Sequence, residues 1–314
     1  MRSKPSNESL PWLIAGLVFM ALLLVVGWLF HGGMGSPAQA LAFKASRADL
    51  VGRMQLELAS ASEAEKSAVL AITDQDSQTY AEQARTASSQ VAQEQHDLRA
   101  LLANGGSPRE RDLLSQFSKV FDDLQRVDNQ VLALAVKNTN LKAYSLLFGP
   151  AADAQAQMDA ALARVVTKYA DSAEAKQVLP LAYGARLGVL RIQALLAPHI
   201  AEESDAKMDQ MEASMTHEEQ QVGEDLSGLA KLSKLASDPD LGAATASFAR
   251  YAELKARILP LSRENTNVRS LALSLNQKRT AMTVCLDALD ALKQEILSEP
   301  IAGVTTYGRL PKPR

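Results

Sequence analysis

The stretch LLSQFSKVFDDLQRVDNQVLALAVKNTNLKAYS, residues 113–145, decides the fold of this 314-residue chain. Its seam positions are alternately four and three residues apart, and eight of the ten are apolar. The seam consists of Leu113, Phe117, Val120, Leu124, Val127, Val131, Leu134, Asn138, Leu141 and Ser145. This spacing lets one helix pack along its whole length against its neighbours. We therefore predict an all-α protein made of long helices.

The helical pattern extends on both sides of this stretch, from residue 44 to residue 298. Short breaks rich in glycine, proline and small polar residues interrupt it, and such residues end, begin or cap helices. They lie at residues 74–77, 105–108, 149–150, 171–172, 198–204 and 237–240, and near residue 276. Short connections make neighbouring helices antiparallel, so we expect an up-down-up-down topology.

The chain also contains an internal repeat with an offset of 127 residues. The triplet Asn-Thr-Asn at residues 138–140 recurs at residues 265–267, and five seam positions recur at the same offset. Leu124, Val127, Val131, Leu134 and Leu141 correspond to Tyr251, Leu254, Ile258, Leu261 and Val268. We therefore predict two tandem antiparallel four-helix bundles, one in residues 44–171 and the other in residues 172–298.

The composition excludes several classes of protein. With 47% hydrophobic residues the chain can build a core, and a net charge of -3 gives no basic surface for nucleic acid. Aromatic residues make up only 5% of the chain, and 16 glycines are too few for the many turns of a β-protein. A single cysteine, Cys285, excludes an internal disulfide framework.

Residues 11–30, PWLIAGLVFMALLLVVGWLF, carry no charge and have the length that a helix needs to cross a bilayer. Trp12 and Trp28 stand at the two ends, where such rings settle at the membrane interface. Arg2 and Lys4 precede the run, so the positive-inside rule predicts a cytoplasmic tail at residues 1–10. We expect a single-pass anchor in a bacterial inner membrane, with the bulk of the chain in the periplasm.

The alternative is a cleaved signal peptide, because residues 38–40, Ala-Gln-Ala, fit a small-x-small cleavage site. The apolar run is longer than a typical signal core, and the site lies ten residues beyond Phe30, so we favour the anchor. Both interpretations export residues 41–314. We assign residues 31–43 to a linker and residues 299–314 to a C-terminal tail.

Two segments resemble a known family. Residues 61–85, ASEAEKSAVLAITDQDSQTYAEQAR, and the heptad helix that enters KNTNLKAYSLLF at residues 137–148 are similar to the four-helix-bundle ligand-binding region of methyl-accepting chemotaxis proteins. The resemblance covers about residues 44–170. The doubled arrangement is similar to the bimodular helical sensor domains of that receptor class.

The resemblance implies a sensor that binds a small ligand or partner and changes its helix packing. No second apolar run, HAMP-like linker or cytoplasmic signalling hairpin follows in this sequence, so we expect the signal to pass through another protein. The alternative is a membrane-tethered scaffold or spacer that binds only proteins. Because isolated bundles of this receptor class tend to pair, we expect a homodimer, with a signalling or envelope protein as a further partner.

Asn138 and Asn265 are candidate site residues, because they occupy seam positions where an apolar residue would pack better. A buried asparagine costs stability unless it is paired, and its best attested role is to fix helix register. The alternative is that each forms the polar floor of a ligand pocket inside its bundle. We favour the register role as the more general one.

Pro180 and Pro260 interrupt two helices of the second predicted bundle, and their kinks are expected at similar heights. Paired kinks would open the bundle there. Guanidinium groups suit carboxylate ligands, and four arginines lie within three turns of these prolines. They are Arg186, Arg191, Arg263 and Arg269. The more ordinary interpretation is that these arginines face solvent and that the kinks only curve the bundle.

No enzyme motif is present: the chain has no Gly-rich phosphate loop, HExxH, GxSxG or Glu-x-x-His pair. We therefore predict no catalytic residues, no metal site and no cofactor.

Overall fold

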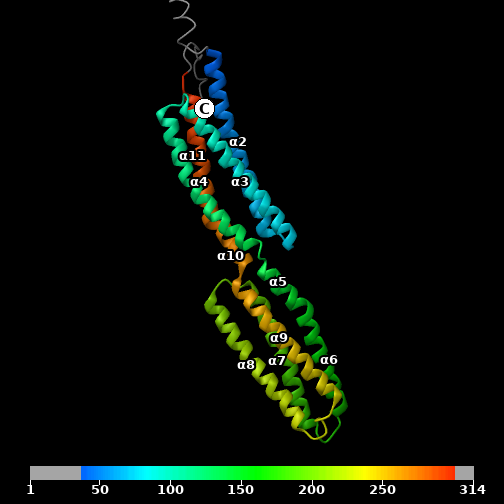
Figure 1. Ribbon diagram of the computed structural model, residues 1–314. Helices are drawn as coiled ribbons and strands as arrows, with labels where there is room; N and C mark the ends of the chain where they lie inside the picture. Colours follow the sequence, from blue (N-terminus) through cyan, green and yellow to red (C-terminus); the bar gives the residue numbers. More distant parts are fainter. Residues whose placement is uncertain (1–36, 301–314) are drawn as a thin grey trace, which may run out of the picture.

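The computed structural model describes residues 37–300, which are helical almost throughout and contain no strand (Figure 1). The all-α prediction is confirmed. The helices are α2 (Pro37–Leu70), α3 (Asp74–Ala103), α4 (Pro108–Ala135), α5 (Thr139–Leu146), α6 (Ala152–Tyr169), α7 (Ala175–Ala201), α8 (Asp205–Lys231), α9 (Pro239–Glu264), α10 (Thr266–Leu273) and α11 (Arg279–Ser298). Two π-helical turns, η1 (Leu147–Ala151) and η2 (Ser274–Lys278), join α5 to α6 and α10 to α11.

The anchor predicted for residues 11–30 and the tail at residues 1–10 lie outside the described residues, as do residues 301–314. Within residues 37–300, every helix is too short or too polar to cross a bilayer. The linker expected at residues 31–43 overlaps with α2, which already begins at Pro37.

Local capping chemistry sets several helix ends where the sequence predicts breaks. The Thr73 hydroxyl accepts from the Asp76 amide and begins α3. At the start of α4, the Ser107 side chain and Glu110 form a reciprocal capping box, with Pro108 at the first helical position. Each of these devices satisfies amides that have no partner in the helix.

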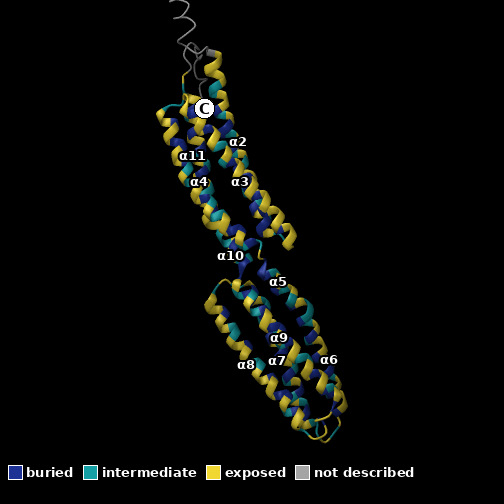
Figure 2. Ribbon diagram, viewed as in Figure 1, coloured by how far each residue is buried: buried dark blue, intermediate teal, exposed yellow. Residues whose placement is uncertain are grey.

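The helices form two four-helix bundles stacked end to end (Figure 1). The terminal bundle consists of α2, α3, α4 and α11, and both ends of the described chain lie at its outer end. The distal bundle consists of α6, α7, α8 and α9. Each bundle has its own buried core (Figure 2). Phe117 and Phe121 stack in the terminal core, and Tyr251 and Met158 are buried in the distal core.

The predicted division into bundles at residues 171 and 172 is wrong. The terminal core combines Phe117 with Leu289 and Leu292 of α11, whereas α6 packs against α7 and α9. The breaks expected at Gly149-Pro150 and near Asn276 do not reverse the chain. Both lie in π-helical turns, through which α5 continues into α6 and α10 into α11.

The repeat nevertheless holds in the structure. The turns η1 and η2 begin at Leu147 and Ser274, and helices α6 and α11 begin at Ala152 and Arg279, at the same 127-residue offset that separates Thr139 from Thr266. The two units have thus exchanged their last helices: α6 of the first unit completes the distal bundle, and α11 of the second completes the terminal bundle. Neither unit forms a closed bundle by itself in this fold.

Candidate functional site

The two bundles meet at a waist, which we define as residues 136–140 and 265–267. Asn138 and Asn265 interrupt the long helices here with left-handed backbone, at φ 52° and φ 53°. Asparagine tolerates this conformation far better than branched residues do. The expectation that the seam helix runs unbroken through residue 138 is therefore wrong, because α4 ends at Ala135 and α5 begins at Thr139.

Repeat-related residues bind one another across the waist in a clasp. The Thr139 amide donates to Thr266 Oγ1 and the Thr266 amide donates to Thr139 Oγ1, each at 3.1 Å. In the same way, the Asn140 amide donates to Asn267 Oδ1 and the Asn267 amide to Asn140 Oδ1, at 3.2 and 3.0 Å. These four bonds satisfy the first amides of α5 and α10, which have no partner in their own helices.

Asn138 and Asn265 take part in this clasp through their side chains. Asn140 Nδ2 donates to Asn265 Oδ1 at 2.7 Å, and Asn267 Nδ2 donates to Asn138 Oδ1 at 2.9 Å. Asn138 and Asn265 are 0% and 1% exposed. The two predicted residues therefore come together in the clasp between the bundles.

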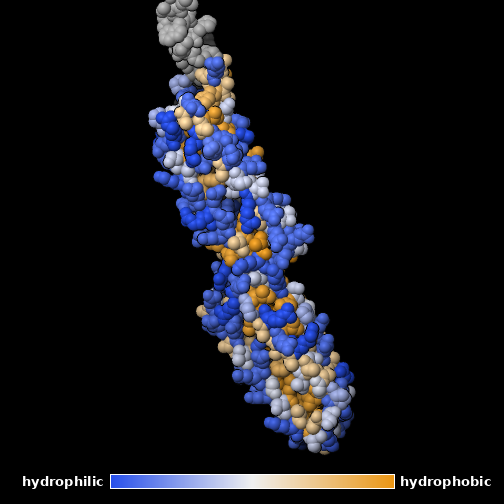
Figure 3. Space-filling view, in the orientation of Figure 1, coloured by the Kyte–Doolittle hydropathy of each residue, from blue (hydrophilic) through white to orange (hydrophobic). Residues whose placement is uncertain are grey.

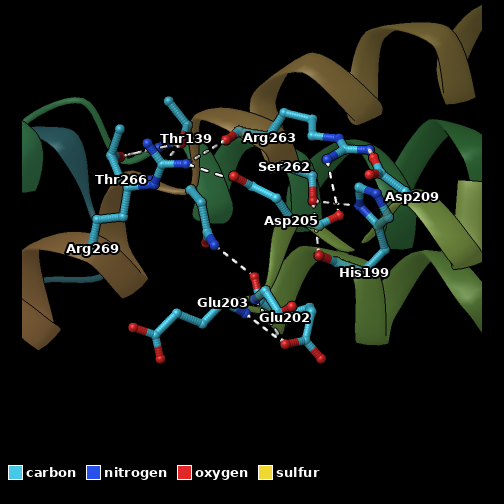
Figure 4. Close-up of polar contacts among 12 residues, drawn as sticks. Thr139, His199, Glu202, Glu203, Asp205, Asp209, Ser262, Arg263, Thr266 and Arg269 are labelled. Atoms are coloured by element: carbon cyan, nitrogen blue, oxygen red, sulfur yellow. Dashed lines mark hydrogen bonds and ion pairs between the residues drawn. The ribbon is translucent and has the colours of Figure 1, made fainter. Parts of the chain in front are cut away.

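A charged cluster lies beside the clasp, where the turn between α7 and α8 meets the end of α9 (Figure 4). Arg263 Nε donates to Glu212 Oε1 at 2.6 Å and Arg263 Nη2 to Asp209 Oδ1 at 2.5 Å. Arg269 Nη2 lies 3.8 Å from Asp205 Oδ1. The Arg263 guanidinium lowers the pKa of the Glu212 carboxyl. Carboxylates of the chain thus already hold these two predicted arginines.

His199 connects this cluster to the core, since it is fully buried between Glu212 and Ser262. Burial lowers the pKa of His199 against the opposing effect of Glu212, which favours the neutral ring. Nε2 lies 2.9 Å from Glu212 Oε1 and Nδ1 lies 2.7 Å from Ser262 Oγ, whose hydroxyl also donates to the His199 carbonyl oxygen at 3.1 Å. The order Ser-His-Glu resembles a hydrolytic triad, but the Ser262 side chain is 0% exposed. We interpret the three residues as a structural network.

This network predicts that acid weakens the fold. A lowered folded-state pKa means that the unfolded chain binds more protons below pH 6.5, so stability is lost as the pH falls through the region below that value. Urea unfolding at pH 5, 6 and 7 should show this loss as a difference between the wild type and a variant without His199. The variant His199→Gln should show less of it, whereas His217→Gln on exposed α8 surface should behave like the wild type. Equal pH dependence in all three proteins would contradict the assignment.

The other two predicted arginines lie further from the waist, on α7. Arg186 makes a bidentate contact with Asp159 of α6, at 2.6 and 3.2 Å, and its guanidinium also lies over the Tyr183 ring. Arg191 Nη1 lies 3.3 Å from Glu218 Oε1 of α8. The structure therefore places the four arginines in separate ion pairs and gathers only Arg263 and Arg269 in one cluster.

The two prolines are not at similar heights. Pro180 stands near the start of α7 at Ala175, and Pro260 stands near the end of α9 at Glu264. Both helices run toward the waist, so Pro260 is close to it and Pro180 is near the far end (Figure 1). The prediction of similar heights is wrong because it required the helix of Pro260 to continue to Asn276, whereas α9 ends at Glu264.

A buried charged cluster in the terminal bundle was not predicted from the sequence. Lys278 Nζ lies 2.7 Å from Glu65 Oε2, 2.8 Å from Ser62 Oγ and 4.0 Å from Asp128 Oδ1. Burial raises the pKa of Asp128 to about 6, against the opposing effect of Lys278. The repeat offered one signal, because Lys278 corresponds to Ala151 and a lysine in place of a buried alanine calls for a partner.

The fold and the clasp define a class of protein, a tandem helical module in which residues 37 and 300 lie at the same end. Comparison with known families finds a match over part of the chain. Residues 54–178 match the model of the four helix bundle sensory module for signal transduction, which confirms the predicted resemblance to the sensor region of chemotaxis receptors. No curated protein matches the chain.

The matched segment runs from α2 through α6 into the start of α7. It therefore spans both bundles of this fold. The segment matches the model of one four-helix sensory module, but its fourth helix lies in the distal bundle.

Proposed function

We propose that this chain is a membrane-anchored, extracytoplasmic sensor module that binds a small ligand, changes its helix packing and signals through another protein. The family match supports the sensory role. The observation that carries the mechanism is the pair of helical tracks that cross the waist, α4–α5–η1–α6 and α9–α10–η2–α11. A shift of either track in one bundle moves a helix of the other, because each track belongs to both.

At the outer end of the terminal bundle, polar contacts join the helices that such a movement would reach. Lys44 Nζ near the start of α2 donates to the Leu297 and Glu299 carbonyl oxygens at 2.7 and 2.6 Å. Arg47 binds the buried Glu110 at 2.5 Å and Glu299 at 2.6 Å. The start of α2, the start of α4 and the end of α11 are thus tied together, next to the segment in which we place the anchor.

The proposal includes the membrane topology. The apolar run at residues 11–30 would hold the terminal bundle beside the bilayer of a bacterial inner membrane and leave the distal bundle farther into the periplasm. A second copy of the chain is the partner that we expect, together with a signalling or envelope protein that receives the output.

The test combines binding with movement in the purified full-length chain. A thermal-shift screen of organic acids, amino acids, amines and metal ions should find a compound that raises the melting temperature by mass action. Spin labels at the exposed Leu41 and Leu297, each substituted by cysteine, should then report a change of about 1–2 Å between α2 and α11. Cys285 will not interfere, because burial raises the pKa of its thiol to about 12.

The alternative function, a tethered scaffold, is favoured by one observation. Tyr183, Leu187 and Leu190 expose apolar side chains along one face of α7, as a protein-binding helix does. If no compound moves the melting transition while cross-linking in cells captures one defined partner, the sensor proposal fails and the scaffold stands. Arg186→Ala and Arg263→Ala test the predicted arginine site, because a carboxylate-induced shift that survives both substitutions excludes it.

A further inference from the structure

A groove of about 320 Å³ lies beside the waist in the terminal bundle, between α2 and the α10–η2–α11 track. Its walls are apolar and come from Val69, Leu70, Leu271, Leu275 and Met282. Leu70 and Leu275 are 68% and 57% exposed, which is unusual for leucines so close to a core. In the face drawn in Figure 3, hydrophobic surface also gathers near the waist.

The repeat-related positions in the distal bundle carry larger side chains than the groove does. Leu271 and Leu275 correspond in the repeat to Tyr144 and Phe148. Those two rings stack at a centroid distance of 5.9 Å, and the Tyr144 hydroxyl donates to the Ala197 carbonyl oxygen of α7 at 3.3 Å. The distal bundle thus carries a stacked aromatic pair, in which Phe148 is 66% exposed, where the terminal bundle has two leucines and an open groove.

Two polar residues of the groove stand where the distal bundle has apolar residues at the repeat-related positions. Ser274 replaces a buried leucine, Leu147, and Arg279 replaces Ala152. Ser274 is only 7% exposed, lines the groove, and its hydroxyl makes no hydrogen bond to any residue in 37–300. Arg279 is an exposed residue that lines the same groove, and it forms no ion pair with a carboxylate among the described residues. This contrasts with Arg186, Arg191 and Arg263, each of which is paired.

We propose that this groove binds a small aromatic carboxylic acid. The ring would occupy the apolar walls, at the place that Tyr144 and Phe148 cover in the distal bundle. The carboxylate would accept from the Arg279 guanidinium and the Ser274 hydroxyl, which are donors without a partner. Lys66 lines the groove as well and adds positive charge, although Glu63 lies 2.9 Å away.

The position of the groove suits a sensor, and the inference rests on the proposed function. A ligand here touches α2 on one side and η2 and the start of α11 on the other. Those two helices meet again at the outer end, where Lys44 binds the last turn of α11. Filling the groove would therefore change the spacing of the two helices that we expect to carry the output.

The test is calorimetric titration of the full-length chain with 3-phenylpropionate as the probe. Two matched compounds separate the contributions to binding. Propionate keeps the carboxylate but lacks the ring, and 3-phenylpropionamide keeps the ring but lacks the charge. We expect each to bind at least about tenfold more weakly than 3-phenylpropionate, because loss of a charged hydrogen bond or of a buried ring costs this much or more.

Three variants locate the site. Arg279→Ala and Ser274→Ala should weaken binding, by about tenfold or more for the arginine. The double variant Leu271→Tyr with Leu275→Phe copies the aromatic pair of the distal bundle into the groove. It should abolish binding while the melting temperature stays equal or rises, since the pair fills an open surface. Arg109→Ala, an exposed arginine at the start of α4, serves as the control and should bind normally.

The outcomes distinguish this inference from the proposed function. Binding of 3-phenylpropionate that survives both Arg279→Ala and the aromatic double variant overturns the groove as its site. If the chain binds a compound of another class and the groove variants leave that binding intact, the inference fails and the sensor proposal stands. If no compound of any class binds, both fail. If the double variant instead makes a dimer monomeric, the groove is a contact between copies and the inference is wrong.

Discussion

Replacing Lys278 with methionine is expected to lower the free energy of unfolding by about 3–5 kcal/mol at pH 7, because breaking a buried ion pair leaves an uncompensated charge. The Lys278 and Glu65 side chains are 4% and 1% exposed. Glu65 Oε1 already lacks a hydrogen-bond partner, and Asp128 lies 4.0 Å from the ammonium group. Removing Lys278 therefore leaves two carboxyl groups in the terminal bundle without a cation.

Urea unfolding followed by circular dichroism measures this loss, and Lys255→Met provides the matched control in the distal bundle. Lys255 is buried too, but its partner Glu219 is 32% exposed and can be solvated when the lysine is removed. We expect the control to lose less than half as much stability. Equal losses in the two variants, or a loss below about 1 kcal/mol for Lys278→Met, would contradict the role of the cluster.

The charged cluster around Lys278 also makes the free energy of unfolding depend on pH. The pKa of Asp128 is raised to about 6 from 3.8, so between these values the folded state binds more protons than the unfolded state. The Asp128 contribution to stability therefore falls as the pH rises from about 4 to about 6, opposite in sign to that of His199. The loss caused by Lys278→Met should be smaller at pH 5 than at pH 7, because a protonated Asp128 needs no counter-charge.

The second large effect is expected for Asn140→Ala in the clasp. Asn140 is buried, and its side chain bonds to the Ile200 carbonyl oxygen at 2.6 Å, to Asn265 at 2.7 Å and to the Asn267 amide at 3.0 Å. Truncation leaves these three groups unsatisfied. We expect a loss of about 2–4 kcal/mol, since each unsatisfied buried group costs roughly 1–3 kcal/mol and the costs overlap.

The clasp also joins the two bundles, so its loss should change cooperativity as well as stability. Differential scanning calorimetry should show one transition for the wild type and two for Asn140→Ala. The repeat-related variant Asn267→Ala is the matched control, because Asn267 is less buried and bonds to Asn138 instead of the Ile200 carbonyl oxygen. A single transition in Asn140→Ala, with a stability loss no larger than that of the control, would show that the clasp does not couple the bundles.

Only part of the candidate site could be predicted from the sequence. Asn138 and Asn265 could be singled out from the repeat, because a polar residue recurs at an otherwise apolar position. Their left-handed backbone could not be predicted, since a buried asparagine in a heptad and one at a helix break look alike in sequence. The arginines were recognised as groups that hold carboxylates, but the partners Asp159, Glu218 and Glu212 come from other helices and depend on packing.

The sequence by itself determined that the chain is helical, that it repeats at 127 residues and that it resembles a sensory module, because these properties follow from local spacing and recurrence. Only the tertiary structure decided which four helices share a core. Gly149-Pro150 is compatible with a reversing loop and with a π-helical turn that continues forward. The choice depends on where the apolar faces of α6 and α11 bury the most surface, which is a property of the whole chain.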